Sequence, residues 1–249
     1  MSATARAFGI TRSLAMYYGI PFRARRLRRF YAQFVQPGAL CFDVGAHAGN
    51  RVRCWRQLGG RVVAIEPQPD FVRVLRWLYG RDQDVVIVPL AVGRNAGSAE
   101  LLVSERTPTV TTLSRDWVAG VQRDPRFAGV SWTRGERVEV VTLQTLIERY
   151  GEPAFVKVDV EGYEAEVLAG LTTPLRRLSF EYLPATREIA LDCIDRLATL
   201  AVYRYNWSPG ESHRLASERW LDAADMRAQL TGLPRLAPSG DVYAVRADA

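Results

Sequence analysis

Short apolar runs alternate with amphipathic stretches along the first third of the chain. The runs at residues 40–44, 62–65 and 85–88 are almost entirely apolar and too short for helices, which is typical of buried parallel strands. Between them, residues 50–58 and 70–79 carry apolar side chains at helical spacing. This order of strand, helix, strand, helix and strand predicts the start of a doubly wound sheet.

The same alternation returns after residue 141. Helices are predicted at 142–150, 162–171, 188–200 and 220–230, and strands at 155–160, 178–182, 202–205 and 241–246. We therefore predict an α/β protein with a Rossmann-like doubly wound sheet of about seven strands and helices on both faces. We expect the last strand to be antiparallel to its neighbours.

Two segments lie outside this alternation. Residues 1–37 contain a helical pattern broken near residues 19–21, so we predict an N-terminal helical cap in front of a single domain, 38–249. The arginine-rich cap either packs on the domain or lies on an anionic surface. Residues 104–136 are long, polar and irregular between two short strands, and they contain Trp117 and Trp132. We interpret them as a lid that covers an acceptor and orders on binding.

Composition narrows the functional classes. The chain has 33 basic residues, and Lys157 is the only lysine among them. The preference for arginine over lysine indicates a bias in the coding sequence more than a nucleic-acid surface. The net charge of +6 is therefore weak evidence for a nucleic-acid partner, and we expect none. The three cysteines form no C-x-x-C pair, and no apolar stretch is long enough to span a membrane. We expect a cytoplasmic protein without disulfides.

A small-residue turn follows the first predicted strand, in the sequence Asp43-Val44-Gly45-Ala46-His47-Ala48-Gly49. Such a turn lets backbone N–H groups approach a ligand, but its G-x-x-x-G spacing differs from the dinucleotide fingerprint. The turn therefore favours a nucleoside that carries an amino-acid tail instead of phosphates. Glu66 ends the second strand, where a carboxylate can accept hydrogen bonds from ribose hydroxyls.

Charged residues interrupt the strand predicted at 155–160. If side chains alternate along it, Lys157, Asp159 and Glu161 point to the same face, opposite three valines. A buried parallel strand should be apolar, so the charges either form a structural ion pair or line a cleft at the strand's carboxyl end. Glu181 closes the next strand at the same edge of the sheet.

The motifs together resemble the FkbM-type methyltransferases over roughly residues 35–185. The resemblance is carried by the turn at 43–49, Ile65-Glu66-Pro67, Val140-Val141-Thr142-Leu143, Glu181 and, most specifically, Val156-Lys157-Val158-Asp159-Val160-Glu161-Gly162-Tyr163-Glu164. It implies a class I methyltransferase domain over 38–249, S-adenosylmethionine as donor, and O-methylation of a sugar, lipid or secondary metabolite. His47 departs from the asparagine expected in the turn, and residues 104–136 match no part of the family pattern.

These observations assign candidate site residues. The candidates for cofactor binding are Asp43, Gly45, Ala46, His47, Gly49, Glu66, Pro67 and Ala91. The catalytic candidates are Asp159, Lys157, Glu161 and Glu181. We expect Asp159 to be the general base, with Lys157 lowering its pKa, and Glu161 to orient the acceptor; His47 is the outside candidate for the base. Asp159, Glu161 and Glu181 could also hold Mg²⁺, although acids alone do not establish a metal site.

Three alternatives stay open beside a methyltransferase of small molecules or glycans. A nicotinamide-dependent oxidoreductase would need a third glycine that the turn lacks, and a Tyr-x-x-x-Lys pair that the sequence does not contain. A nucleic-acid methyltransferase is favoured only by the arginines at 23–29. A cofactor-binding protein without catalysis is the third.

Overall fold

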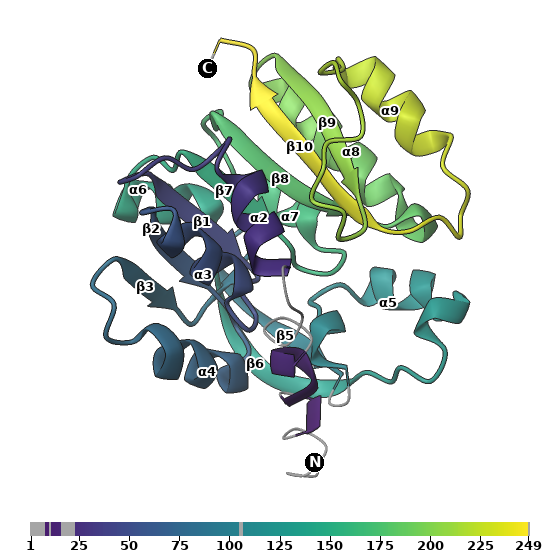
Figure 1. The fold of residues 1–249 in the computed structure, drawn as a ribbon. Coiled ribbons are helices and arrows are strands. Elements are labelled where there is room, and N and C mark those ends of the chain that lie inside the picture. The colour runs from purple at the N-terminus through teal and green to yellow at the C-terminus, as the bar shows by residue number, and fades with distance from the viewer. Residues whose placement is uncertain (1–7, 10, 16–22, 105–106, 249) are drawn as a thin grey trace.

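A seven-stranded sheet runs through the centre of the chain (Figure 1). The computed structural model describes residues 8–9, 11–15, 23–104 and 107–248. The strands of this sheet are β1 (Leu40–Val44), β2 (Arg61–Ile65), β3 (Val85–Val88), β7 (Phe155–Val158), β8 (Arg177–Tyr182), β9 (Tyr203–Pro209) and β10 (Gly240–Arg246). Their order is β3-β2-β1-β7-β8-β10-β9. All seven predicted strands are therefore confirmed.

The directions of the strands determine which loops lie together at each edge of the sheet. The pairs β1–β2, β2–β3, β1–β7 and β7–β8 are parallel, so the loops that follow β1, β2 and β7 meet at one edge of the sheet. β10 inserts between β8 and β9 and is antiparallel to both, as expected for the last strand. Ligands of such sheets bind outside the carboxyl ends of the parallel strands.

Helices cover both faces of the sheet (Figure 1). One face packs against α2 (Arg23–Tyr31), α3 (Asn50–Gln57) and α4 (Pro69–Tyr79). The other packs against α6 (Leu143–Tyr150), α7 (Glu164–Ala169), α8 (Glu188–Leu200) and α9 (Ala223–Thr231). Side chains along β1 alternate between the two helical layers: Cys41 packs against the first layer and Phe42 against the second. This explains why the parallel strands are apolar almost throughout.

The helix α2 belongs to the packing of the sheet. Its Phe30 and Tyr31 are buried with Phe34, and the ring of Phe34 stacks on Tyr243 of β10 at 5.4 Å between centroids. Phe155 of β7 completes the aromatic cluster, at 5.1 Å from Phe34. The helical cap predicted over 1–37 thus contributes core side chains through α2. The predicted break near 19–21 lies outside the described residues.

A second sheet joins the region between β3 and α6. It contains β4 (Ala91–Val92), β5 (Gly97–Val103) and β6 (Thr133–Val141), in the order β4-β6-β5. Two of these strands, β5 and β6, correspond to the two short strands predicted on either side of residues 104–136, and both are longer than expected. Between β5 and β6 lie η1 (Pro108–Val110), α5 (Arg115–Val121) and η2 (Pro125–Phe127), and η3 (Pro184–Thr186) follows β8.

The prediction of an irregular segment at 104–136 is wrong for α5. The side chain of Ser114 caps this helix by accepting a hydrogen bond from the backbone N–H of Trp117 at 3.0 Å. Trp117 is buried and makes edge contacts with the rings of Phe127 and Trp132, at 5.5 and 6.0 Å between centroids. The two tryptophans therefore order this segment through a small apolar cluster of their own. Within the described ranges, no helix combines the length and apolarity needed to cross a membrane.

Candidate functional site

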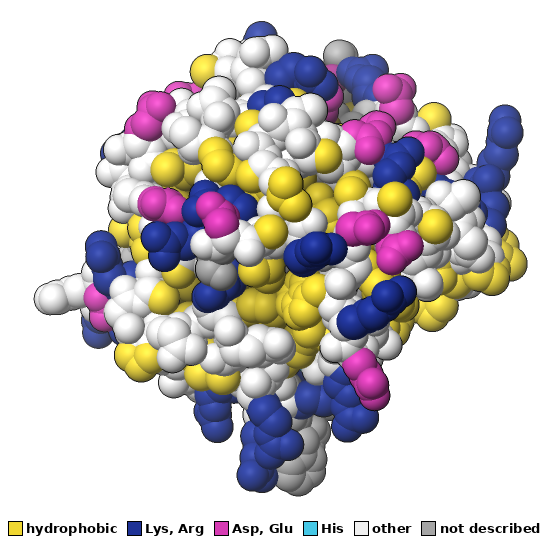
Figure 2. Space-filling view, turned by 90° about the horizontal axis from the view of Figure 1, so that it is seen from above, with side chains coloured by type: hydrophobic (Ala, Val, Ile, Leu, Met, Phe, Trp, Pro, Cys, Tyr) yellow, Lys and Arg dark blue, Asp and Glu magenta, His cyan; other side chains and the backbone are white. Residues whose placement is uncertain are grey.

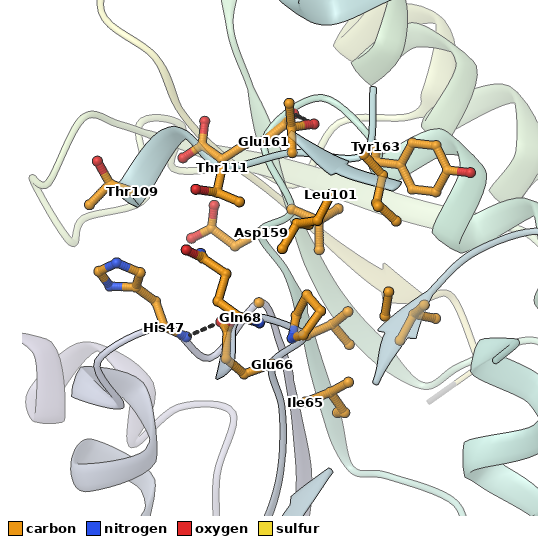
Figure 3. Close-up of a pocket in the computed structure, with 18 of the residues that line it drawn as sticks. His47, Ile65, Glu66, Gln68, Leu101, Thr109, Thr111, Asp159, Glu161 and Tyr163 are labelled. Carbon is orange, nitrogen blue, oxygen red and sulfur yellow. Dashed lines mark hydrogen bonds between the residues drawn. The ribbon is translucent and has the colours of Figure 1, made fainter. Parts of the chain in front are cut away.

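A cavity opens at the carboxyl ends of β1, β2 and β7 (Figure 3), and its empty space, counted with the open mouth, is about 740 Å³. The loops after these strands form one side, and η1 with the residues that follow it forms another. In Figure 3, His47 and Glu66 lie at one end of the cavity and Glu161 lies toward the other, with Asp159 and Gln68 between them. The edge predicted from strand direction therefore carries the cavity.

The turn after β1 approaches the loop after β7 very closely. Gly45 has a φ of 85°, and a Cβ at this position would overlap the carbonyl oxygen of Asp159. The N–H groups of Gly45 and Ala46 both donate to the carbonyl of Ile65, at 2.9 and 3.0 Å. Only glycine combines this left-handed backbone with such close contact, so the turn brings the ends of β1, β2 and β7 together.

Glu66 anchors the turn from the end of β2. Its carboxylate accepts hydrogen bonds from the backbone N–H of His47 at 2.8 Å and of Gln68 at 2.7 Å. The side chain is buried, and this burial raises the pKa of Glu66 to about 7 despite the two hydrogen bonds, which lower it. A carboxylate has about four lone-pair sites, so Glu66 can still accept hydrogen bonds from a ligand.

His47 adopts a φ of 46° in the same turn and lines the cavity. Its ring lies 3.8 Å from the ring of Phe71, between centroids. Burial lowers the pKa of the His47 imidazole to about 3, so the ring is neutral at physiological pH. Such a weakly basic imidazole is a poor acceptor of a substrate proton.

The remaining cofactor candidates fall into two groups. Pro67 and Ala91 line the cavity together with Gly45. Asp43, Ala46 and Gly49 are not among the lining residues: Ala46 belongs to the core under α2 and α3, and a Cβ on Gly49 would lie 2.8 Å from Leu75.

Asp43 is the exception within the second group, because its surroundings leave it unsatisfied. Within the described part of the chain, neither carboxylate oxygen of Asp43 has a hydrogen-bond partner, although the side chain is buried. Burial raises the pKa of Asp43 to about 6, an effect that Arg51 opposes. A buried acid without partners is costly unless a ligand or water supplies them.

The strand prediction at 155–160 is two residues too long. β7 ends at Val158, and the chain then turns sharply, with a φ of 55° at Glu161 and 85° at Gly162. Glu164 stabilises this turn by accepting hydrogen bonds from the N–H groups of Val160 at 3.0 Å and Gly162 at 3.3 Å. Strict alternation therefore stops before Glu161, whose place in the cavity follows from the turn.

The turn at Glu161 and Gly162 is also held by residues from the segment between β5 and β6. The hydroxyl of Thr112 donates to the carbonyl of Glu161 at 2.6 Å. Trp117 of α5 packs against Gly162 so closely that a Cβ on this glycine would overlap the indole ring. The segment between β5 and β6 is thus in direct contact with the loop that carries the candidate acids.

Lys157 is fully buried and does not line the cavity. Its Nζ lies 3.3 Å from Asp159 Oδ2 and 2.7 Å from Asp241 Oδ1, so the ion-pair interpretation is correct for this residue. Arg51 approaches the same oxygen of Asp159 at 3.2 Å. Burial alone would raise the pKa of Asp159, but Lys157 and Arg51 outweigh it and hold this pKa below its ordinary range.

Glu161 and Glu181 differ from Asp159 in their electrostatics. One carboxylate oxygen of each of these three acids lies within 4.8 Å of the others. Burial, followed by the neighbouring charges of Asp159 and Glu164, raises the pKa of Glu161 well above its ordinary value. Burial and the charge of Glu161 do the same to the pKa of Glu181, which lines a smaller cavity of about 210 Å³ beside Trp117.

Sequence reasoning missed several residues of the site. Arg51 and Asp241 contact Lys157 or Asp159, and neither stands in a recognisable motif. Glu164 was part of the family pattern but received no role. Gln68, which lines the cavity beside Glu66, follows directly after the predicted Glu66-Pro67 end of β2.

The fold and the cavity define a class I methyltransferase architecture, with an antiparallel β10 and a pocket at the carboxyl ends of the parallel strands. The chain belongs to the FkbM methyltransferase family, because residues 43–229 match the family described as Methyltransferase FkbM domain.

Known proteins resemble the chain to different extents. The hexuronic acid methyltransferase AglP of Haloferax volcanii is 30% identical over 141 residues, which cover 56% of this chain and 52% of AglP. The chain therefore spans about half the length of this relative. A TehB-like SAM-dependent methyltransferase from Corynebacterium glutamicum is 10% identical, with a TM-score of 0.49 over 98% of each chain. Aeropyrum pernix fibrillarin, solved with S-adenosyl-L-methionine, is 12% identical, with a TM-score of 0.44 over 85% of this chain and 68% of its own.

Proposed function

We propose that the chain transfers the methyl group of S-adenosylmethionine to a hydroxyl group of a small molecule, sugar or glycan. The observation that carries this proposal is the cavity at the carboxyl ends of β1, β2 and β7, where Glu66, Asp159 and Glu161 face a common space in an FkbM-family chain (Figure 3). The printed name of AglP, a hexuronic acid methyltransferase, supports a sugar-like acceptor.

The residues around the cavity fit this donor. Gly45, His47, Glu66, Pro67 and Ala91 would hold the nucleoside part, with Glu66 accepting hydrogen bonds from ribose hydroxyls. When bound, S-adenosylmethionine supplies a methyl group activated by a positively charged sulfur.

The turn after β1 discriminates between donors. Its G-x-x-x-G spacing lacks the middle glycine of the dinucleotide fingerprint, which a pyrophosphate needs for close backbone approach. The turn therefore favours methyl transfer over hydride transfer.

Proton removal from the acceptor falls to Glu161 in this proposal. A general base is most effective when its pKa lies near the working pH. The pKa of Glu161 is raised and that of Asp159 is lowered, so Glu161 is the stronger base of the two. Asp159, which we expected to be the base from the sequence, is better suited to hold a hydroxyl or a positive charge as a permanently ionised carboxylate.

A small-molecule acceptor also agrees with the charges on one face of the molecule. On the face shown in Figure 2, basic and acidic side chains are intermixed with apolar ones. Nucleic-acid sites are instead formed by basic patches or stripes.

Titration calorimetry with S-adenosylmethionine, S-adenosylhomocysteine and NAD tests the donor. We expect both adenosyl compounds to bind at a single site and NAD to show no heat above dilution. Transfer of labelled methyl groups to panels of neutral sugars, uronic acids and small alcohols then identifies the acceptor. Binding of NAD without binding of S-adenosylhomocysteine would refute the proposal.

Replacing Glu66 tests the ribose contact. Above pH 7, where Glu66 is largely ionised, Glu66→Ala should weaken S-adenosylhomocysteine binding by about 1.5–3 kcal/mol per hydrogen bond lost, since these bonds then involve a charged acceptor. Glu66→Gln should weaken it less, because the amide keeps one oxygen acceptor for the turn. Calorimetry measures both variants beside Glu152→Ala, which removes an exposed acid far from the cavity. Wild-type affinity in Glu66→Ala would show that the carboxylate does not contact the donor.

The segment between β5 and β6 should respond to ligands as a lid. Its contact with Gly162 through Trp117 links it to the loop that carries Glu161. We expect saturating S-adenosylhomocysteine to slow tryptic cleavage after Arg115 and Arg123, which are exposed, while cleavage in α2 after Arg25 stays constant as an internal control. Peptide mapping of timed digests measures both. Equal protection at the two places, or none at either, would argue against a lid.

A further inference from the structure

A chain of alternating charges extends from the wall of the cavity, which Arg51 and Asp159 line, to Lys157 and Asp241 behind it. Lys157 Nζ contacts Asp241 Oδ1 at 2.7 Å and Asp159 Oδ2 at 3.3 Å. Arg51 reaches Asp159 Oδ2 at 3.2 Å and Asp241 Oδ2 at 4.0 Å. Two cations therefore share two carboxylates, and only one of the carboxylates, that of Asp159, lines the cavity.

The environment of these charges makes their pairing important. The side chain of Lys157 is fully buried, and those of Arg51 and Asp241 are each 14% exposed. A buried ammonium needs compensating charge, because water cannot solvate it. Asp241 supplies the shorter of the two contacts to Lys157, and the hydroxyl of Tyr243 donates to Asp241 Oδ2 at 3.3 Å. Asp241 is thus the nearest carboxylate to the lysine.

These ion pairs determine which carboxylate oxygen of Asp159 is available to a ligand. Lys157 and Arg51 both approach the Oδ2 atom of Asp159, which leaves Oδ1 for the cavity. Without Asp241, the buried ammonium would keep Asp159 as its nearest carboxylate. The attraction would then draw Asp159 away from the cavity toward Lys157.

We propose that Asp241 is a positioning residue for methyl transfer, which holds Lys157 so that the carboxylate of Asp159 stays at the cavity wall. This inference rests on the proposed function. Asp241 lies on β10, opposite Glu181 of β8, and is not among the residues that line the cavity. It therefore acts through Lys157 and does not touch the reacting groups.

Other titratable groups surround this network and contribute to its charge. Those that interact with Lys157 or Asp159 from neighbouring elements are Tyr31, Asp43, His47, Glu161, Glu164, Glu181 and Glu211. Substitutions at Asp241 leave all seven unchanged.

The single lysine makes the network directly observable. Protein labelled with ¹⁵N and ¹³C in lysine should give one side-chain signal, from Lys157. In the wild type we expect an ammonium that stays protonated beyond the ordinary lysine range, about pH 10.4, because Asp159 and Asp241 outweigh the effect of burial on the pKa of Lys157. Asp241→Asn should shift this signal and make it titrate at lower pH. Asp241→Glu should restore a protonated ammonium with a smaller shift.

Asp248→Asn is the matched control, since it removes a carboxylate near the end of the same strand that pairs with Arg246 outside the network. It should leave the lysine signal unchanged. If Asp241→Asn does not fold, Asp241→Glu still tests the contact, because the longer side chain must move the lysine signal. An unchanged lysine signal in Asp241→Asn, or in Asp241→Glu when only that variant folds, would overturn the proposal.

Kinetics separates positioning from mere support of the fold. With the acceptor identified by methyl transfer, Asp241→Asn should lower kcat by about 10²-fold, the scale of a small misplacement of a reacting group. The acceptor KM and the S-adenosylhomocysteine affinity should stay at wild-type values, and Asp241→Glu should recover part of kcat. A kcat within twofold of wild type in a variant whose lysine signal has shifted would overturn the positioning role. Failure of the wild-type protein to bind S-adenosylhomocysteine would instead refute the proposed function.

Discussion

Glu161→Gln should lower the rate of methyl transfer by about 10²–10⁴-fold, the usual contribution of a general base. S-adenosylhomocysteine binding should persist, because the amide has nearly the same shape as the carboxyl group. The wild-type rate should rise with pH, since the raised pKa of Glu161 means that its basic form appears only above the ordinary carboxyl range. Initial rates across pH, at saturating donor and acceptor, measure this dependence, and Glu161→Gln should lose it.

Two comparisons make this result specific. Glu152→Gln changes an exposed acid in the same way and should retain the wild-type rate and pH profile. Asp159→Asn should lower the rate but keep the dependence on pH, because its pKa is already depressed by Lys157 and Arg51. If Asp159→Asn removes the pH dependence and Glu161→Gln does not, Asp159 is the base, as the sequence suggested.

Gly45→Ala should abolish donor binding. The left-handed backbone alone costs a non-glycine residue about 1–3 kcal/mol, and the new Cβ would also overlap the carbonyl oxygen of Asp159. Relief of this overlap requires the turn after β1 to separate from the loop after β7, which widens the cavity at the place where both loops contribute to it. Calorimetry with S-adenosylhomocysteine should detect no binding at concentrations that saturate the wild type.

Gly38→Ala provides a control for the backbone effect. Gly38 has a φ of 79°, close to the 85° of Gly45, but a Cβ there would meet no atom within 4 Å. This variant should lose stability in thermal unfolding and still bind S-adenosylhomocysteine normally. Equal loss of binding in both variants would mean that backbone strain, and not contact with Asp159, explains the result.

The sequence allowed the parallel part of the sheet to be predicted because strands such as β1 and β2 are short apolar runs, each with a turn after it. β1 and β2 are buried on both faces, so almost every residue in them is apolar and marks the strand in the sequence. The end of β7 could not be predicted in this way, since the turn at Glu161 depends on hydrogen bonds to Glu164 and Thr112. A non-glycine residue with positive φ leaves no periodic signal.

The candidate site was predictable only in part, for a similar reason. Residues adjacent in the chain, such as Asp159 and Glu161, could be grouped by spacing alone. The partner of Lys157 on β10 could not, because strand order brings Asp241 into place after more than 80 residues of intervening chain. The helix α5 was missed because its stability comes from one cap and from contacts of Trp117 with Phe127 and Trp132.

The pairing of β5 with β6 has an evolutionary consequence. Val103 and Thr133 are partners in this antiparallel pair, so the intervening segment leaves and re-enters the fold at neighbouring points. Because the strands already hold its ends together, doubling the length of such a loop costs only about 0.6 kcal/mol in closure entropy. Descendants of this chain can therefore exchange the whole segment by insertion or deletion while the large sheet and its donor-side turn stay unchanged. If the segment covers the acceptor, as proposed above, acceptor preference can diverge in this lineage faster than the scaffold does.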